Sequence, residues 1–332
     1  MSPASPELIL GIDAGNTKTI ALIADTCGSV LGWGRAGRSN IYVSKPRALR
    51  AIDQAVQAAL KGAGLPASGA PLSAVTLSAT GADWPEDFQL LEAHLAGRGW
   101  GRRHRVVNDA VGALRAGSLD GTGVAVACGT SAGIAARSPQ GAVWHSSYWQ
   151  EPEGANELGR HALRAVYRAE LGIDPPTSLT GRILAHYRQD NVEVLLHSQT
   201  RRDRHVTQQI GRLARILLDE AAGGDQTSLN LVCKHGQALG DYALAAARRV
   251  GLNGPYTLVT SGGVMRHPSH ILIRAMMDRV RQGNPRVQWQ PSRHEPVFGA
   301  LLLAYEDTAR PVTDPVLERL EHTCPDASLF LT

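Results

Sequence analysis

The chain has 332 residues, enough for two domains of ordinary size or one large one. Hydrophobic residues make up 43% of it and aromatic residues only 5%, so we expect a core built mainly from aliphatic side chains and alanine. The net charge is +4, from 34 basic and 30 acidic residues, and the arginines are scattered. This pattern disfavours a nucleic-acid-binding face, and no stretch of sequence is apolar for long enough to span a membrane.

Four cysteines are spread along the chain, at Cys27, Cys128, Cys233 and Cys324, and no two of them form a CxxC pair. This spacing disfavours both a disulfide framework and a zinc ribbon. The first residues also lack the basic segment and long apolar stretch of a secretory signal. We therefore expect a cytoplasmic protein with neither a membrane nor a nucleic-acid partner.

The first 120 residues predict three consecutive strands followed by alternating helices and strands. Short apolar runs at 8–12, 20–24 and 30–33 are separated by turns rich in glycine, asparagine and aspartate, which is typical of antiparallel strands. The elements expected after them are a helix following Pro46 and stopping at 62–64, a strand at 72–77, a helix from 85 to about 96, a strand at 105–107 and a helical segment after Asn108.

A second round of the same pattern begins near residue 121. Strands are predicted at 124–127, 133–136 and 142–144, again with tight turns. The elements expected next are a helix with Val206, Ile210, Leu213 and Leu217 on one face, a helix at about 226–250, a strand at 256–260 leading through two glycines into a helix, and a last helix from Pro296. Because the three-strand meander occurs twice, the sequence favours two similar α/β lobes over a single Rossmann unit.

The turn after the first strand carries a candidate phosphate site, Gly11-Ile-Asp13-Ala-Gly15-Asn16-Thr17-Lys18-Thr19. Glycine lets the backbone come close to a ligand, and the amides and hydroxyls of Asn16, Thr17 and Thr19 can donate to phosphate oxygens. Asp13 leaves the strand end toward the same place, where it could bind a Mg²⁺ ion that keeps most of its waters. The alternative is an ordinary β-hairpin with a polar tip.

The second meander has an equivalent turn, Gly129-Thr130-Ser131. The three residues alone are weak evidence, but their recurrence at the same place in a second lobe is stronger. Two facing hairpins can bind a triphosphate from both sides.

A carboxylate follows the last predicted strand of the first lobe, in Asn108-Asp109-Ala110. It would project from the carboxyl edge of the sheet, where α/β proteins bind their ligands. Asp109 could accept the proton of an attacking hydroxyl in phosphoryl transfer, or it could simply cap the helix that follows.

These motifs together resemble the BadF/BadG/BcrA/BcrD ATPase family, which includes N-acetylglucosamine and glucosamine kinases. The resemblance covers roughly residues 8–306. It implies an actin/hexokinase/Hsp70-like α/β fold, with two RNase H-like lobes and an ATP cleft between them. The implied domains are 1–118, joined by the closing helix 295–308, and 119–294.

The resemblance also assigns roles along the cleft. The residues that it places at ATP are Gly15, Asn16, Thr17, Lys18, Thr19, Gly129, Thr130, Ser131, Gly224, Gly262, Gly263 and His267. Asp13 would position Mg²⁺, and Asp109 would be the catalytic base. The loop Arg38-Ser39-Asn40 is similar to one whose asparagine contacts the sugar, and Asn108 lies beside the base.

One stretch departs from the sugar-kinase pattern. Residues 144–157 lack the glycines and the aspartate that the family carries there, and Trp149 and Glu153 are the candidates left to contact the sugar. We predict an ATP-dependent kinase that phosphorylates a hydroxyl of an amino sugar, N-acetylglucosamine or glucosamine, to give the 6-phosphate.

The sequence leaves open two alternatives to a kinase, and it also leaves open whether the protein forms a homodimer. An activator-type ATPase would need cysteines placed for an iron–sulfur cluster, and Cys128 has no cysteine partner before Cys233. A non-catalytic nucleotide- or sugar-binding regulator on a related fold would usually add a DNA-binding helix-turn-helix, and the first strand begins by residue 8. A homodimer is possible.

Overall fold

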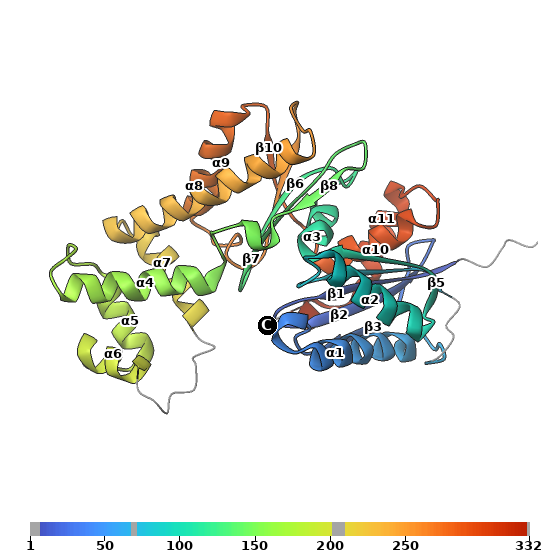
Figure 1. The fold of residues 1–332 in the computed structure, drawn as a ribbon, viewed down its shortest axis with the longest axis horizontal. Coiled ribbons are helices and arrows are strands. Elements are labelled where there is room, and N and C mark those ends of the chain that lie inside the picture. Colours follow the sequence, from blue (N-terminus) through green and yellow to red (C-terminus); the bar gives the residue numbers. More distant parts are fainter. Residues whose placement is uncertain (1–6, 68–71, 201–209, 331–332) are drawn as a thin grey trace, which may run out of the picture.

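The computed structural model describes residues 7–67, 72–200 and 210–330. They form two five-stranded sheets that lie side by side, each with helices of its own (Figure 1). The predicted pair of α/β lobes, each opening on a three-strand meander, is confirmed. Within the described ranges, no helix combines the length and apolar character needed to cross a membrane.

The first sheet has the strand order β3-β2-β1-β4-β5. Its strands are β1 (Leu8–Ala14), β2 (Thr19–Asp25), β3 (Val30–Ala36), β4 (Leu72–Ala79) and β5 (Gly101–Asn108). The meander β1-β2-β3 is antiparallel, whereas β4 and β5 run parallel to β1. Because parallel strands end at the same edge, the chain segments that follow β1, β4 and β5 are brought together.

Two helices cover the outer face of this sheet, α1 (Ile41–Gly62) and α2 (Pro85–Arg98). The predicted face of α1 is buried, with its apolar residues packed on the strands. This helix begins at Ile41, five residues before the expected start at Pro46. Asn40 caps it, and a break at Ser44 accommodates the proline.

The second sheet has the order β10-β9-β6-β7-β8. Its strands are β6 (Gly123–Cys128), β7 (Ala132–Arg137), β8 (Val143–His145), β9 (Thr257–Ser261) and β10 (Gln288–Pro291). Again the first three are antiparallel, and β9 runs parallel to β6. The ends of β6 and β9 are adjacent, since Ala127 pairs with Ser261.

A group of helices covers the second sheet and extends away from it (Figure 1). They are α4 (Ala155–Glu170), α5 (Leu179–Tyr187), α6 (Val192–Thr200), α7 (Leu213–Ala222), α8 (Gln226–Arg249) and α9 (Ile271–Gly283). The expected helix through Val206 differs from the structure, because α7 begins only at Leu213, after a single 3₁₀ turn at Ile210–Arg212. Val206 itself lies outside the described residues.

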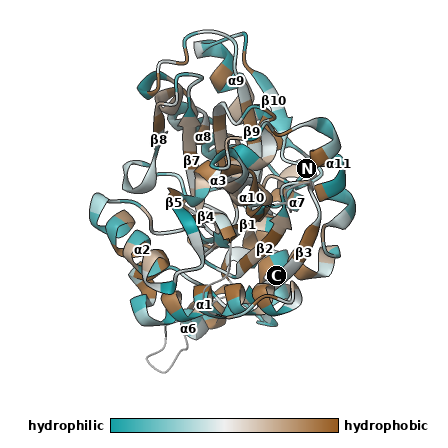
Figure 2. Ribbon diagram, turned by 90° about the vertical axis from the view of Figure 1, so that its right-hand side faces the viewer, coloured by the Kyte–Doolittle hydropathy of each residue, from teal (hydrophilic) through white to brown (hydrophobic). Residues whose placement is uncertain are grey.

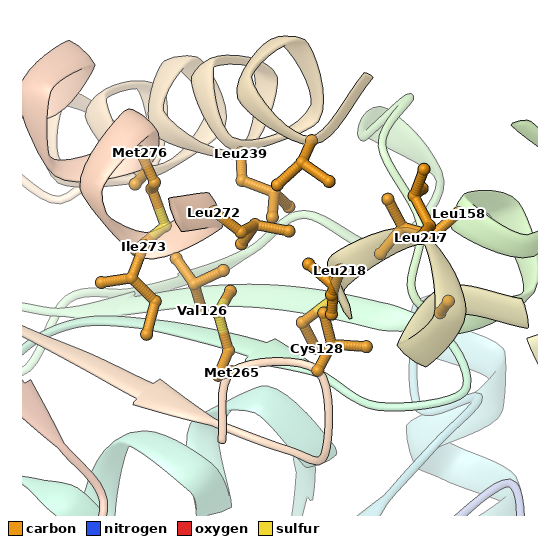
Figure 3. Packing of buried hydrophobic residues seen from close by; sticks show 14 of the residues in the cluster. Val126, Cys128, Leu158, Leu217, Leu218, Leu239, Met265, Leu272, Ile273 and Met276 are labelled. Atoms are coloured by element: carbon orange, nitrogen blue, oxygen red, sulfur yellow. The ribbon is translucent and has the colours of Figure 1, made fainter. Parts of the chain in front are cut away.

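The core of this lobe is aliphatic, as the composition predicts. Figure 3 shows Val126 and Cys128 of β6 beneath Leu239 of α8 and Met276 of α9, all of them buried. The loop 262–270 separates β9 from α9, so the paired glycines do not lead directly into a helix as expected.

Two helices lie between the sheets, α3 (Asp109–Gly117) and α10 (Pro296–Glu306) (Figure 2). The helix α10 packs on the first sheet through residues such as Val297 and Leu301, and α3 packs on the second. The two helices approach so closely that a Cβ on Gly299 would lie 1.9 Å from the carbonyl oxygen of Gly112. The lobes therefore meet along this helix pair, which glycine makes possible.

Candidate active site

The carboxyl edge of the first sheet carries two carboxylates and a hydroxyl. The strands β1, β4 and β5 end in register, with Ala14 opposite Ala79 and Ala79 opposite Asn108. The amide of Thr80 donates to the carbonyl of Ala14 at 2.9 Å, and this hydrogen bond holds the ends of β1 and β4 together. This register brings Asp13, Thr80 and Asp109 into one cavity of about 510 Å³ between the lobes.

Asp109 is not the cap of α3. That position belongs to Asn108, whose side-chain oxygen accepts from the amide of Ala110 at 3.1 Å. The Asp109 carboxylate instead accepts a hydrogen bond from the hydroxyl of Thr80 and faces the cavity. Burial raises its pKa, although the hydrogen bond from Thr80 opposes that shift.

Asp13 lies in the same cavity and is electrostatically coupled to Asp109. Burial, and then the nearby charge of Asp109, raise the pKa of Asp13 to about 7. A divalent cation would stabilise two such carboxylates in their charged form. No three His, Cys, Asp or Glu side chains gather as a complete metal site in the described residues, so the ion would take most of its ligands from water and phosphate, as Mg²⁺ does.

The turns predicted to bind phosphate lie face to face across the cavity. The hydroxyls of Thr17 and Thr130 are 3.2 Å apart, and the Asn16 amide donates to the Ser131 hydroxyl at the same distance. These four residues line the cavity, as do Gly15 and Gly129. The structure thus brings the two motifs together from opposite lobes.

Two other residues of the first turn point elsewhere. The hydroxyl of Thr19 is buried and donates to the carbonyl of Gly37 at 2.7 Å, while the Lys18 ammonium donates to the carbonyl of Phe330. Neither side chain lines the cavity, although the charge of Lys18 is near enough to oppose the raised pKa of Asp13. Contact of these two residues with phosphate stays a prediction. Thr19 is the first residue of β2, and its hydroxyl also donates to the Ser39 hydroxyl at 2.8 Å, so the segment at 37–39 covers this side chain.

The nucleoside residues are only partly at the cavity. Gly262 lines it with φ +96°, and a Cβ there would lie 2.4 Å from the carbonyl oxygen of Cys128. Gly263 and Gly224 do not line it, nor does His267, whose ring contacts Asp219 at 3.1 Å. Those three positions are therefore outside the cavity that holds the carboxylates.

The two asparagines expected at the sugar, Asn40 and Asn108, have hydrogen-bond partners within the cavity lining. Asn40 donates to the side-chain oxygen of Asn16 at 2.8 Å and so links the acceptor loop to the first turn. The amide of Asn108 donates to a carboxylate that sequence reasoning missed, Asp83, at 3.0 Å. Both asparagines line the cavity.

The expectation for Trp149 is not met by the geometry. Its side chain is 63% exposed and does not line the cavity, whereas its neighbour Tyr148 does. Both belong to a 3₁₀ turn at Ser147–Trp149, where a shift of one residue redirects the side chain. Glu153 does line the cavity, but its carboxylate is 53% exposed and pairs with Arg160 at 2.9 Å.

Sequence reasoning therefore missed Thr80, Asp83, Tyr42 and Tyr148 in the cavity lining. For Thr80 and Asp83 a signal was present, because a polar segment follows the buried parallel strand β4 just as Asp109 follows β5. The two tyrosines give no such signal, because they come from opposite lobes and meet only in the folded chain.

The BadF/BadG/BcrA/BcrD ATPase family matches residues 10–304. The chain belongs to this family.

Curated relatives of this BadF/BadG/BcrA/BcrD-family protein span nearly its whole length. It is 24% identical to the N-acetyl-D-glucosamine kinase of Dictyostelium discoideum, over 90% of this chain and 98% of the relative. It is 26% identical to the N-acetylmuramic acid/N-acetylglucosamine kinase of Clostridium acetobutylicum, over 89% of this chain and 97% of the relative.

Solved structures share the fold. A Chromobacterium violaceum protein described as a candidate N-acetylglucosamine kinase superposes with a TM-score of 0.68 at 23% identity, covering 90% of this chain and 99% of that one. A Streptomyces griseus glucokinase of the ROK family gives 0.55 at 18%, covering 90% and 99%. The expected two-lobed, actin-like ATPase fold is confirmed.

Proposed function

We propose that this BadF/BadG/BcrA/BcrD-family protein is an ATP-dependent kinase that transfers the γ-phosphoryl group to a hydroxyl of an amino sugar, giving the 6-phosphate. Membership in an ATPase family makes ATP the nucleotide of the cleft. The relatives are kinases of N-acetylglucosamine, N-acetylmuramic acid and glucosamine, which supplies the acceptor class. The single observation that carries the proposal is Asp109, which faces one cavity with both phosphate turns.

Asp109 is suited to the role of general base. Its carboxylate would accept the proton of the acceptor hydroxyl while that oxygen attacks the γ-phosphorus. The bond from the γ-phosphorus to the bridging oxygen breaks, and ADP leaves with the electron pair. The hydrogen bond from Thr80 fixes the orientation of the carboxylate, and burial raises its pKa, which favours proton acceptance.

The two facing turns would hold the phosphates, with Thr17 and Asn16 on one side and Thr130 and Ser131 on the other. Gly262 would let the nucleoside approach bare backbone. Asp13 would hold Mg²⁺, which when bound neutralises charge on the phosphates. Asn40 and Asn108 would bind hydroxyls of the sugar.

We also propose that residues 1–118 with 295–308, and residues 119–294, act as two domains that close on the substrates. Hydrogen bonds between the turns and the close contact of α3 with α10 are consistent with a closed state. Closure would exclude water, so that the sugar receives the phosphoryl group. A cytoplasmic location would give the protein its ATP, and a homodimer remains a prediction.

The test is an ATP-consumption assay with glucosamine, N-acetylglucosamine, N-acetylmuramic acid and glucose as acceptors. Consumption that depends on an amino sugar, with the product phosphorylated at the 6-hydroxyl by phosphorus NMR, is expected. ATP hydrolysis that no sugar stimulates would contradict the proposal and favour an ATPase without kinase activity.

The iron–sulfur alternative requires cysteine thiolates as cluster ligands. Cys128 is buried, and burial raises the pKa of its thiol to about 12, which disfavours the thiolate that a cluster requires. Protein prepared without air is therefore expected to contain no stoichiometric iron. An iron content near one cluster per dimer would favour the iron–sulfur ATPase over the kinase.

A further inference from the structure

Asp83 lines the cavity and accepts hydrogen bonds from both lobes. One carboxylate oxygen, Oδ1, accepts from the Asn108 amide at 3.0 Å and from the Ser147 hydroxyl at 2.8 Å. Asn108 belongs to the first lobe and Ser147 to the second. The carboxylate is therefore oriented by two neutral donors, which leave its negative charge uncompensated.

The imidazole of His145 lies near Asp83, on the far side of Ser147. Burial lowers the pKa of His145 and so favours its neutral ring, which cannot neutralise the carboxylate. Four carboxylates line the cavity, those of Asp13, Asp83, Asp109 and Glu153, and among the described lining residues there is no lysine, arginine or histidine. Burial raises the pKa of Asp83, as expected for a carboxylate that loses water without gaining a cationic partner. The lining side chains thus add negative charge and no positive charge, which disfavours an acceptor that carries a carboxylate.

The other three carboxylates have partners or roles of their own. Glu153 is neutralised by Arg160 at 2.9 Å, and Asp13 and Asp109 face the phosphate turns. Asp83 is in no ion pair within the described chain. It is the carboxylate left for the acceptor.

A group of aromatic rings lies in the same cavity lining as Asp83. Tyr148 is stacked on Trp84 with a ring-centroid distance of 6.2 Å and an interplanar angle of 7°. It also meets Tyr42 edge-on, at 5.6 Å and 81°. Tyr42 and Tyr148 line the cavity, from opposite lobes. Aromatic rings favour both cations and the apolar faces of sugar rings.

We infer that Asp83, with Tyr42 and Tyr148, makes this cavity select an acceptor that carries a protonated amine, over acceptors with a neutral acetamide, a hydroxyl or a carboxylate in its place. The inference rests on the proposed kinase function and narrows its acceptor to a free amino sugar of the glucosamine type. The ammonium would donate to the carboxylate of Asp83, and a charge-assisted bond of this kind is stronger than a neutral one. Glu153, held by Arg160, would not substitute for it.

The experiment compares kcat/KM for glucosamine, glucose, N-acetylglucosamine and N-acetylmuramic acid at neutral pH. We expect glucosamine to exceed glucose by about 10- to 100-fold, the usual worth of one hydrogen bond to a charged group, and N-acetylmuramic acid to be the poorest acceptor. Asp83→Asn retains an oxygen for Asn108 and Ser147 but loses the charge. This variant should reduce the ratio of kcat/KM for glucosamine to that for glucose to within about twofold. A merely structural role of Asp83 would lower kcat/KM for both acceptors by the same factor.

The alternative, in which the amine of the acceptor binds at Glu153, is tested with the variant Glu153→Gln. This variant should keep the ratio of glucosamine to glucose, and a collapse of the ratio there would place the amine at Glu153 and overturn the inference. Equal kcat/KM values for glucosamine and glucose in the wild type would overturn it as well.

A calorimetric titration separates this inference from the proposed function. Glucosamine that binds the wild type and loses about tenfold or more in affinity with Asp83→Asn supports the inference even if no phosphoryl transfer is detected. In that case only the kinase proposal fails. Glucosamine binding that is the same in both proteins would overturn the inference, whatever the kinase assay shows.

Discussion

The hydroxyl of Thr17 lies 3.2 Å from the hydroxyl of Thr130, although the two residues are 113 positions apart and belong to different lobes. A parallel contact joins Asn16 to Ser131. The two turns therefore contact each other directly, and a ligand between the lobes would meet hydrogen-bond donors from both turns. This relationship is the most specific feature of the cavity, since it depends on the position of one lobe against the other.

Removal of one of these hydroxyls should weaken nucleotide binding. We expect Thr130→Ala to raise the KM for ATP several-fold, in line with the loss of a single hydrogen bond, while the KM for the sugar changes little. Steady-state kinetics with each substrate varied in turn measures both values. Thr308→Ala is the matched control: Thr308 follows α10, its hydroxyl donates to the carbonyl of Tyr305 at 2.8 Å, and its loss should leave the KM for ATP unchanged.

The role of Asp109 predicts a defect in turnover rather than in binding. Asp109→Asn preserves the shape of the side chain but cannot accept the proton, so kcat should fall by about 10²–10⁴-fold. ATP affinity, measured by calorimetry, should stay near that of the wild type. A variant that phosphorylates its sugar at the normal rate would show that Asp109 is not the base.

The two adjacent glycines after β9 should respond differently to alanine. Gly262→Ala places a methyl group 2.4 Å from the carbonyl oxygen of Cys128 at φ +96°, so both the melting temperature and ATP affinity should fall. A Cβ on Gly263 meets no protein atom within 4 Å. Gly263→Ala should therefore keep the melting temperature.

ATP affinity then reports whether the nucleoside lies at Gly263. A rise in the Kd for ATP, without a change in melting temperature, would support the predicted contact, and an unchanged Kd would remove Gly263 from the site. Gly254→Ala, where a Cβ also meets nothing within 4 Å, is the control and should affect neither quantity.

A buried histidine should contribute less to stability in mild acid than at neutral pH. His235 is 4% exposed, and its Nε2–H donates to the carbonyl of Glu153 at 2.9 Å. Burial lowers its pKa in the folded state, so the folded protein favours the neutral ring. The stabilisation is present above the unfolded pKa of about 6.5 and is lost as the pH falls below that value toward the lowered folded pKa.

Denaturant unfolding between pH 8 and pH 5 measures this loss. His235→Gln should be less stable than the wild type at pH 8, where a hydrogen bond is disturbed, and this difference in the free energy of unfolding should shrink as the pH falls, while the carboxyl contributions cancel between the two proteins. The exposed helix residue His322 provides the control, and His322→Gln should retain the wild-type slope. Equal slopes for His235→Gln and the wild type would show that this ring does not titrate on unfolding.

The sequence by itself determined the two lobes and the positions of their phosphate turns. Apolar runs of strand length separated by glycine and asparagine turns specify the meanders locally, since hydrophobic period and turn chemistry act over a few residues. For the same reason the placement of Asp109 at a strand end was predictable, because the segment that follows a buried parallel strand emerges at the carboxyl edge of the sheet.

Only the tertiary structure decided which side chains reach the cavity. Thr19 and Lys18 share the first turn with Thr17, yet Thr19 faces the interior and Lys18 reaches Phe330, more than three hundred residues away. In the same way Tyr148 enters the cavity and Trp149 does not. The physical reason is that contacts distant in sequence decide which side chain is covered: Gly37 and Ser39 bind the hydroxyl of Thr19. In the 3₁₀ turn, side-chain direction changes by about 120° per residue, so only one of two neighbours faces the other lobe.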